Sequence, residues 1–261
     1  MNTPNHDEVV RRSFERQVSL FSGPDSPFAR RSEGGLSWIA PLTDDTIVLD
    51  MACGAAHASE PIAPHVRQVV GIDLTSALLR VGAQRLHDRG IDNVLLQEAN
   101  AESLPFMDAS FEVVFCRSSL HHFANPNRAV SEMVRVCRIG GRVVLADLVA
   151  PTGAVRERFD FVHRLIDPSH VHAFVEAELV DFLPGGIDGL TYADTSTIRL
   201  PIDIALTDQS EKTSVLDILD AEVRSDGQPT GFEPLVEDGK LVVSFTTCVV
   251  HAECREPHHL I

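Results

Sequence analysis

The sequence has 261 residues, of which 38 are acidic and 22 basic, so its formal net charge is −16 at pH 7. This excess of negative charge repels nucleic-acid phosphates and anionic lipid surfaces, so we expect neither nucleic acid nor a membrane as a partner. Apolar residues make up 44% of the chain, which suffices for a folded core and excludes disorder over long stretches.

The cysteine pattern and the start of the chain are typical of a cytoplasmic protein. The first residues are polar, so no signal peptide is visible, and no apolar run reaches the roughly 20 residues that span a bilayer. Five cysteines without a C-x-x-C pair indicate neither a disulfide framework nor a zinc site. We therefore expect reduced thiols in a cytoplasmic protein.

Five short apolar runs alternate with helical stretches in the first part of the chain. The runs cover residues 46–51, 68–74, 93–99, 111–116 and 141–148. Several are apolar throughout, as in parallel strands that are covered on both faces. Helices are predicted to begin at Thr75-Ser76 and Asn125-Pro126 and to end at Gly90 and Gly140. Strands alternating with helices predict a doubly wound sheet.

The rest of the chain is less regular. A leading helix over 9–20 precedes a Gly/Ser/Pro loop, and further elements are predicted as helices over 152–166, 174–183 and 214–223, β segments over 190–204 and 241–252, and a turn-rich loop over 226–239. We divide the chain into 1–40 (N-terminal helix and cap segment), 41–150 (cofactor-binding core) and 151–261 (cap helices and strands that complete the same sheet).

An acid followed by small residues ends the first predicted strand. Residues 48–57 read VLDMACGAAH, in which Ala52 and Gly54 follow Asp50. Small residues let backbone amides meet a polar ligand, because a bulky Cβ would hold the ligand off the backbone. The segment predicts one end of a ligand-binding crevice.

Polar residues also end the next two strands. Asp73 ends the second, where a carboxylate can accept both ribose hydroxyls of a bound nucleoside. The alternative is that Asp73 only helps to cap the helix that begins near Thr75. Asn100 and Ala101 follow the third strand, where an amide side chain and a backbone amide can bind the edge of adenine.

Four segments together resemble the class I S-adenosylmethionine (SAM)-dependent methyltransferases. They read VLDMACGAAHAS, VVGIDLTSALL, EANAESLPFMDASFEVVFCRSSLHHF and MVRVCRIGGRVVLADLVAP, and DPSHVHAF follows at 167–174. The resemblance is greatest to the small-molecule branch that includes ubiquinone/menaquinone C-methyltransferases. It implies an α/β, Rossmann-like, doubly wound sheet of seven strands, mostly parallel with an antiparallel last strand, plus a helical cap. Residues 190–204 and 241–252 would be strands six and seven.

The resemblance also implies where SAM binds. Its amino-acid end would contact Asp50, Ala52 and Gly54, its ribose Asp73, and its adenine Leu74, Asn100 and Ala101, with Arg117 as a further cofactor-binding residue.

Ala56 departs from the family's pattern, which usually has a further glycine at this place. A methyl group costs little there if φ is negative, but otherwise it can crowd the methionine carboxylate or force a backbone shift. Glu60-Pro61 follows, so the next helix is expected to begin or kink near Ser59-Glu60. Either SAM binds in a slightly altered geometry, or the site has lost SAM.

Three histidines are candidate bases for the removal of a proton from the acceptor. His121 and His122 follow the fourth strand, on the face where the methyl group of SAM should lie, and His170 can reach the acceptor from the cap. The alternative is that these histidines pack beneath the site or cap a helix. Their spacing gives no metal site, so no metal is expected.

The expected function is methyl transfer from SAM to the oxygen or carbon of a small hydrophobic acceptor, such as an aromatic or polyketide-like compound. S-adenosylhomocysteine would be the product, and a homodimer is a further expectation. The phenylalanines that could line the acceptor pocket, or else form ordinary core, are Phe14, Phe21, Phe28, Phe159, Phe161, Phe174 and Phe182. Two alternatives remain: an NAD-dependent oxidoreductase, which predicts G-x-G-x-x-G where only Gly54 is present, and a non-methylating descendant, which Ala56 supports.

Overall fold

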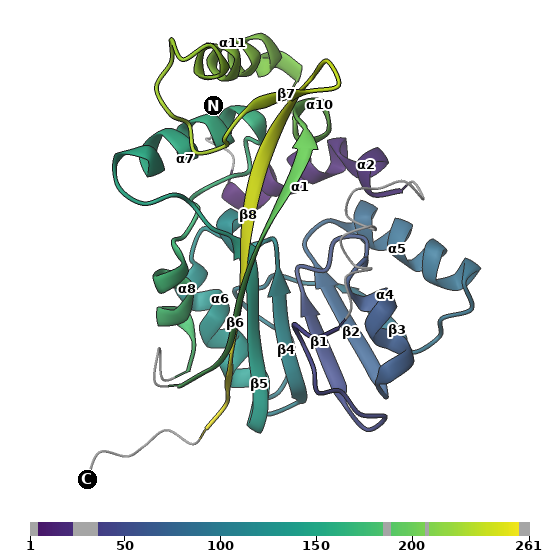
Figure 1. Cartoon of the computed structure of the whole chain (residues 1–261). Coiled ribbons are helices and arrows are strands. Elements are labelled where there is room, and N and C mark those ends of the chain that lie inside the picture. The colour runs from purple at the N-terminus through teal and green to yellow at the C-terminus, as the bar shows by residue number, and fades with distance from the viewer. Residues whose placement is uncertain (1–4, 23–35, 185–188, 207–208, 256–261) are drawn as a thin grey trace.

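The computed structural model describes residues 5–22, 36–184, 189–206 and 209–255 (Figure 1). Within them one sheet has the strand order β3-β2-β1-β4-β5-β8-β6, with β7 paired to β8 off this path. The strands are β1 (Ile47–Met51), β2 (Gln68–Asp73), β3 (Val94–Glu98), β4 (Phe111–Arg117), β5 (Cys137–Leu148), β6 (Leu190–Pro201), β7 (Leu235–Glu237) and β8 (Lys240–Glu253).

The strand directions confirm the predicted sheet. Strands β1 to β5 pair in parallel, whereas β8 runs antiparallel to β5 and to β6. The order reverses at β1 and β4, which leaves a crevice beyond the carboxyl ends of these two strands. The sequence did not predict β7, which makes the described sheet eight-stranded rather than seven-stranded.

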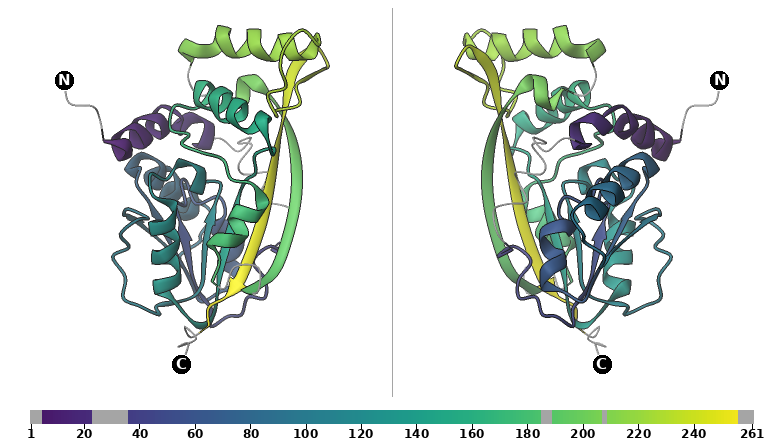
Figure 2. Two further views of the ribbon diagram at one scale, coloured as in Figure 1. Left: turned by 90° about the vertical axis from the view of Figure 1, so that its left-hand side faces the viewer. Right: turned by 90° about the vertical axis from the view of Figure 1, so that its right-hand side faces the viewer.

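Helices cover both faces of the sheet and the space beyond its strand ends (Figure 2). In chain order they are α1 (His6–Arg16), α2 (Val18–Ser22), α4 (Ser59–Ile62), η2 (Ala63–His65), α5 (Ser76–Asp88), η3 (Leu120–His122), α6 (Pro126–Val136), α7 (Ala154–Ile166), α8 (Glu176–Phe182), α10 (Ile202–Ala205), η4 (Gln209–Glu211) and α11 (Lys212–Val223). The helices α1, α2, α7, α10 and α11 lie beyond the carboxyl ends of the central strands and form the predicted cap (Figure 1).

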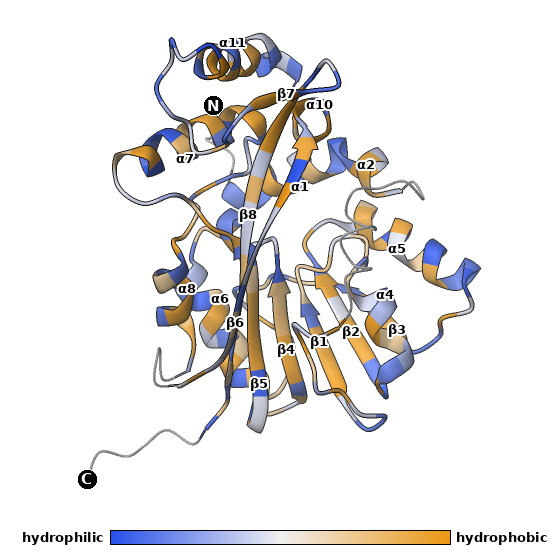
Figure 3. Cartoon of the chain, viewed as in Figure 1, coloured by the Kyte–Doolittle hydropathy of each residue, from blue (hydrophilic) through white to orange (hydrophobic). Residues whose placement is uncertain are grey.

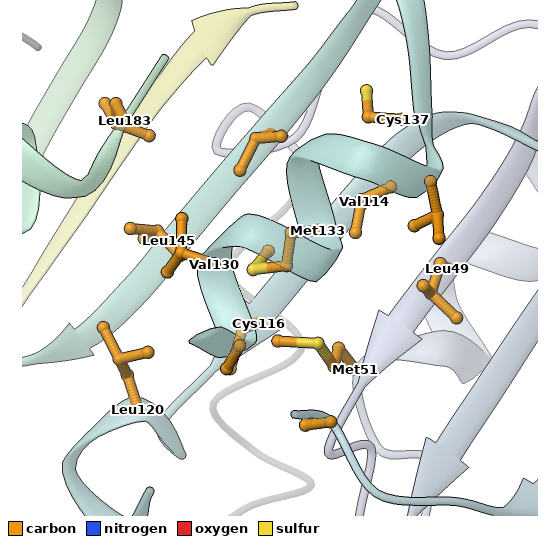
Figure 4. Packing of buried hydrophobic residues seen from close by; sticks show 14 of the residues in the cluster. Leu49, Met51, Val114, Cys116, Leu120, Val130, Met133, Cys137, Leu145 and Leu183 are labelled. Carbon is orange, nitrogen blue, oxygen red and sulfur yellow. The ribbon is translucent and has the colours of Figure 1, made fainter. Parts of the chain in front are cut away.

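The central strands are apolar because both of their faces are buried, as Figure 3 shows. One core cluster lies between the sheet and α6, where Met133 is fully buried and packs with residues of β1, β4 and β5 (Figure 4). A second cluster includes Ile39, Ile62 and Phe115. Full burial of one such side chain stabilises the fold by roughly 1.5–3 kcal/mol.

A local signal accounts for the start of α6. Asn125 accepts a hydrogen bond from the backbone N–H of Arg128 with Pro126 at the first helical position, which confirms the predicted cap of α6. The helix near Ser59-Glu60 also begins as predicted. The single helix predicted over 9–20 is wrong, because the chain turns at Gln17 between α1 and α2. The side chain of Gln17 is buried at this turn and donates to Asp167.

The end of α6 differs slightly from the prediction. The helix stops at Val136 and Cys137 already pairs with Phe111 as the first residue of β5, so the strand begins before Gly140. The β segment predicted to reach residue 204 also ends earlier, because Ile202–Ala205 form α10. Phe28 and most of the predicted Gly/Ser/Pro loop lie outside the described residues.

Strands β6 and β8 form a long ribbon that leaves the sheet and rises into the cap (Figure 1). Strand β8 pairs with β5 from Glu253 to Thr247, and from there to Val242 it continues along β6. The strand β7 then pairs with the start of β8. None of the described helices is long and apolar enough to cross a membrane.

Candidate active site

One cavity of about 860 Å³ lies over the carboxyl ends of β1, β2 and β4 and extends under the cap. It is lined by all the residues predicted to bind the cofactor, namely Asp50, Ala52, Gly54, Asp73, Leu74, Asn100, Ala101 and Arg117. Two of the three candidate bases, His121 and His122, line the same cavity. The structure therefore brings together residues that four separate strand ends supply.

The turn after β1 is built from three residues in the left-handed backbone region. Ala52 has φ 58°, Gly54 has φ 56° and Ala56 has φ 60°. Glycine adopts this region freely, whereas a left-handed L-residue costs roughly 1–2 kcal/mol. Because φ of Ala56 is positive, the condition under which its methyl group would cost little, a negative φ, is not met, and the methyl group is fully buried.

Asp50 is buried beneath this turn at the end of β1. Its carboxyl accepts a 2.6 Å hydrogen bond from Ser59 Oγ, which ties β1 to the start of α4. Burial raises the pKa of Asp50 to about 7, although the hydrogen bond from Ser59 and the charge of Arg117 oppose the shift. A cation beside Asp50 would stabilise the carboxylate and lower this pKa.

Asp73 joins the first two strand ends. Its two carboxylate oxygens accept hydrogen bonds of 2.8 Å from the backbone N–H groups of Gly54 and Thr75. Through its bond to Thr75, Asp73 does help to cap α5, as the alternative interpretation of this residue predicts. The side chain of Thr75 itself makes no cap hydrogen bond. Because each carboxylate oxygen has a second lone pair, both can still accept a hydroxyl group from the cavity. Burial raises the pKa of Asp73.

Asn100 faces the N-terminal helix as well as the cavity. Its amide nitrogen donates to Asp7 over 3.0 Å, and its amide oxygen accepts from the backbone of Glu102 over 2.8 Å. Arg11 of the same helix donates to the carbonyl oxygen of Leu74. Asp7 and Arg11 were not predicted as site residues, because the spacing of a polar helix face does not indicate which strand ends the helix will contact.

His121 is held by a buried carboxylate. Its Nδ1 pairs with Asp147, which is 1% exposed and lies near the end of β5. Asp147 also accepts from the backbone N–H groups of Ser119, Leu120 and Leu148 at 2.5–3.1 Å. Burial alone would raise the pKa of Asp147, but His121 and the backbone N–H of Leu148 lower it below its ordinary value. The signal for Asp147 was present in the sequence, as the one acid in the otherwise apolar end of the run GRVVLADL.

His122 belongs to a second polar cluster. Its Nδ1 lies 3.0 Å from Ser169 Oγ, and Ser169 donates to Asp167 over 2.6 Å. Asp167 also accepts from Ser13 of α1. Burial and the nearby His121 lower the pKa of His122 to about 3, so this ring is neutral at pH 7.

His170, the third candidate base, is not among the described residues that line the cavity. Its Nε2 pairs with Asp160 over 2.7 Å, and its ring stacks on His163 with 4.0 Å between the ring centres. His163 does line the cavity, with its ring centre 5.8 Å from that of His121. His163 was not predicted as a site residue, because a single histidine on the apolar face of a helix is typical of an ordinary core residue.

The acceptor end of the cavity is bounded by the β6–β8 ribbon. Alternate residues face it from each strand, including Ser196 and Ile198 of β6 and Phe245 and Thr247 of β8. Of the phenylalanines considered in the sequence, Phe14 and Phe21 line the cavity. Phe159, Phe174 and Phe182 belong to the core clusters, and Phe161 is 46% exposed. Among the described residues no group of three or more His, Cys, Asp or Glu side chains is arranged to hold a metal ion.

Comparison with known proteins identifies the family. The model of a methyltransferase domain matches residues 49–145. The chain is 36% identical over 156 residues to the uncharacterized methyltransferase YcgJ of Bacillus subtilis, covering 59% of this chain and 61% of YcgJ. It is 32% identical over 144 residues to the uncharacterized protein YafE of Escherichia coli, covering 55% of this chain and 69% of YafE. The chain belongs to the class I SAM-dependent methyltransferases.

Further likeness supports the placement within this methyltransferase family. The chain is 35% identical over 119 residues to the ubiquinone/menaquinone biosynthesis C-methyltransferase UbiE of Idiomarina loihiensis, covering 44% of this chain and 47% of UbiE. The crystal structure of YcgJ superposes with a TM-score of 0.74 and 25% identity, covering 88% of this chain and 98% of YcgJ. The methyltransferase-domain model covers residues 49–145, whereas the likeness to the YcgJ structure covers 88% of the chain.

Proposed function

We propose that this chain binds SAM in the cavity and transfers its methyl group to a small, hydrophobic acceptor on oxygen or carbon. One observation carries the proposal. A single cavity extends from the strand ends that the family uses for its cofactor to the ring of His121. Nδ1 of that ring pairs with the buried carboxylate of Asp147. Family membership supports the cofactor, and the apolar residues of the ribbon support the acceptor.

The residues present fit SAM chemically. The turn over residues 52–56 has no side chain larger than that of Cys53, so a ligand can approach its backbone. The buried carboxyl of Asp50 suits the cationic amino group, and the carboxylate of Asp73 has lone pairs for two ribose hydroxyls. The raised pKa of Asp50 follows from burial of a carboxyl beside another acid, and a cation would relieve it.

The cofactor, when bound, supplies an electrophilic methyl group, so the chain itself needs to orient the acceptor and remove a proton. Asp147 fixes the ring of His121 through Nδ1, which leaves Nε2 to accept a proton from an acceptor hydroxyl or acidic carbon. Leu148, Ile198 and Phe245 line the acceptor end and exclude water from an apolar molecule.

The two alternative functions predict different binding. An NAD-dependent oxidoreductase would bind NAD⁺ at the turn after β1, where this chain has Gly54 but not the further glycines of that motif. A non-methylating descendant would bind a ligand in the same cavity without consuming SAM.

The test is a methyl-transfer assay with SAM labelled in its methyl group. We expect label to pass to at least one member of a panel of phenols, enols and hydroxyquinones, with equimolar S-adenosylhomocysteine formed. The His121→Asn variant should lose this activity by about 10²–10⁴-fold while it still binds S-adenosylhomocysteine. Binding of S-adenosylhomocysteine without turnover on any panel member would favour the non-methylating alternative.

A further inference from the structure

Five of the described histidines line the cavity, among them His121, His122 and His163. For these three, the environment of Nδ1 decides which hydrogen-bonding group the ring offers to a ligand. For His121 that environment is Asp147. The pKa of Asp147 is lowered despite its burial, so the carboxylate is ionised at pH 7 and can only accept. The proton of a neutral His121 therefore resides on Nδ1, and Nε2 presents a lone pair to the cavity.

His122 has the same tautomer for a different reason. Ser169 gives its hydroxyl proton to Asp167, so its oxygen can only accept from Nδ1 of His122. Burial lowers the pKa of His122 to about 3, and the ring therefore holds one proton, on Nδ1. Its Nε2 is therefore unprotonated and carries a lone pair, like Nε2 of His121.

His163 differs from both. Its Nδ1 is buried and has no hydrogen-bond partner among the described residues. A buried N–H without an acceptor is rarer and more costly than a buried nitrogen lone pair, so the proton of this ring belongs on Nε2. Burial and the neighbouring His170 lower the pKa of His163 well below 6.5, so the ring is neutral and Nδ1 stays unprotonated.

The cavity wall thus presents a lone pair at His121 and an N–H donor at His163. The two ring centres are 5.8 Å apart and the rings are inclined by 27°. Because both rings line the same cavity and their centres are this close, one small molecule with two oxygens can contact both. Leu148, Ile166 and Phe245 give the cavity an apolar surface for the remainder of the ligand, although Asp194 and Arg199 of the ribbon line the same cavity.

We propose that the methyl acceptor is an apolar enol or phenol with a carbonyl group next to its hydroxyl. The hydroxyl gives up its internal hydrogen bond to the carbonyl and donates to Nε2 of His121, and the carbonyl oxygen then accepts from Nε2 of His163. This inference rests on the proposed function, since it names the substrate class of that same site. A simple phenol would leave the N–H of His163 without an acceptor, and a simple ketone would leave His121 without a donor.

The tautomers can be measured directly in the wild-type protein. In ¹⁵N-labelled protein at pH 7, the imidazole nitrogen shifts should show protonated Nδ1 for His121 and His122 and protonated Nε2 for His163. The His163→Gln variant assigns the His163 signals. A protonated Nδ1 on His163 would overturn the proposal.

Binding of three naphthalene probes to the protein saturated with S-adenosylhomocysteine tests the substrate class. The probe 1-hydroxy-2-acetonaphthone has both groups, 1-naphthol only the hydroxyl and 2-acetylnaphthalene only the carbonyl. Wild-type protein should bind the first at least about tenfold more tightly than either of the others. Equal affinity for 1-hydroxy-2-acetonaphthone and 1-naphthol would contradict the role of His163.

Two variants separate a hydrogen bond from a packing effect. His163→Phe should remove the preference for 1-hydroxy-2-acetonaphthone over 1-naphthol and leave the affinity for 1-naphthol unchanged. His163→Gln, which keeps an N–H donor at similar reach, should restore most of the preference. Equal weakening of all three probes in both variants would mean that His163 is structural only and would overturn the proposal.

The affinity for S-adenosylhomocysteine, measured first in each protein, distinguishes failure of the proposed function from failure of the acceptor assignment. Wild-type protein that does not bind this compound contradicts the proposed function. Wild-type protein that binds it but shows no probe preference contradicts only the assignment of the acceptor.

Discussion

The two ends of the cavity are built in different ways. The cofactor end comes from strand ends between residues 50 and 117, each a few residues of sequence at the carboxyl end of a parallel strand. The acceptor end combines α7, η3 and a ribbon of β6 and β8, which are far apart in the chain. Parallel strands place their carboxyl ends at one edge, so a local motif predicts the first end, whereas only the tertiary fold assembles the second.

The two ends also differ in charge. Asp50, Asp73 and Arg117 give the cofactor end ionisable groups, and the ribbon adds Asp194 and Arg199 to the cavity wall. Burial keeps the imidazoles of His122 and His163 neutral, as their lowered pKa values indicate. A charged ligand group is therefore expected beside the buried carboxyls, and a neutral ligand group beside these two imidazoles.

The largest expected effect is on cofactor binding. Asp73→Ala removes the proposed acceptor of two ribose hydroxyls, and hydrogen bonds to a charged group contribute roughly 1.5–3 kcal/mol each. We expect the affinity for S-adenosylhomocysteine to fall by about 10²–10⁴-fold in isothermal titration. Asp92→Ala, at an exposed acid beyond the end of α5, is the control and should bind normally. Unchanged affinity in Asp73→Ala would show that the ribose binds elsewhere.

The next effect concerns the acceptor end. Asp147→Asn replaces one acceptor oxygen by a donor that faces N–H groups, which should destabilise the fold by about 2–4 kcal/mol at pH 7. Because the pKa of Asp147 is lowered in the folded state, its stabilisation is present above the unfolded pKa of about 3.9 and is lost as pH falls below it. Urea unfolding should show the wild-type advantage shrinking below about pH 4. A difference that does not change with pH would contradict this account.

A smaller effect is expected at Asp50. Its pKa is raised to about 7 by burial, so its stabilisation is greatest below the unfolded pKa and declines as pH rises through about 7. A bound cation lowers this pKa, so SAM should release up to about half a proton on binding at pH 7. The titration enthalpy should then differ between phosphate and Tris buffers. Asp50→Asn should abolish the difference, and persistence of the difference in that variant would assign the proton to another group.

The smallest effect tests the strained turn. Ala56→Gly relieves the left-handed strain but adds backbone entropy to the unfolded chain, so the free energy of unfolding should change by less than about 1 kcal/mol and can rise. Ala83→Gly, at an exposed site within α5, should cost about 1 kcal/mol. Thermal unfolding of both variants measures whether Ala56→Gly costs less stability than Ala83→Gly. An equal loss at the two positions would mean that Ala56 is not strained.

The sequence predicted the central sheet because buried parallel strands are continuously apolar. It predicted which residues gather in the cavity because they follow those strands directly, whereas their contact with SAM stays a prediction. It missed β7, a three-residue strand that forms because the ribbon offers an edge for pairing. It missed the turn at Gln17, which depends on the buried contact with the distant Asp167. It chose His170 rather than His163 for the cap, because the stacking of the two rings depends on how α7 folds against the 167–174 segment. The expected homodimer stays a prediction.

Isothermal titration of the wild-type protein with S-adenosylhomocysteine, SAM and NAD⁺ tests the central claim most directly. The predicted result is one binding site for each adenosyl compound and no heat from NAD⁺ at the same concentrations. Absence of binding by both adenosyl compounds at millimolar concentration, or competition of NAD⁺ for the same site, would contradict the claim that this cavity holds SAM.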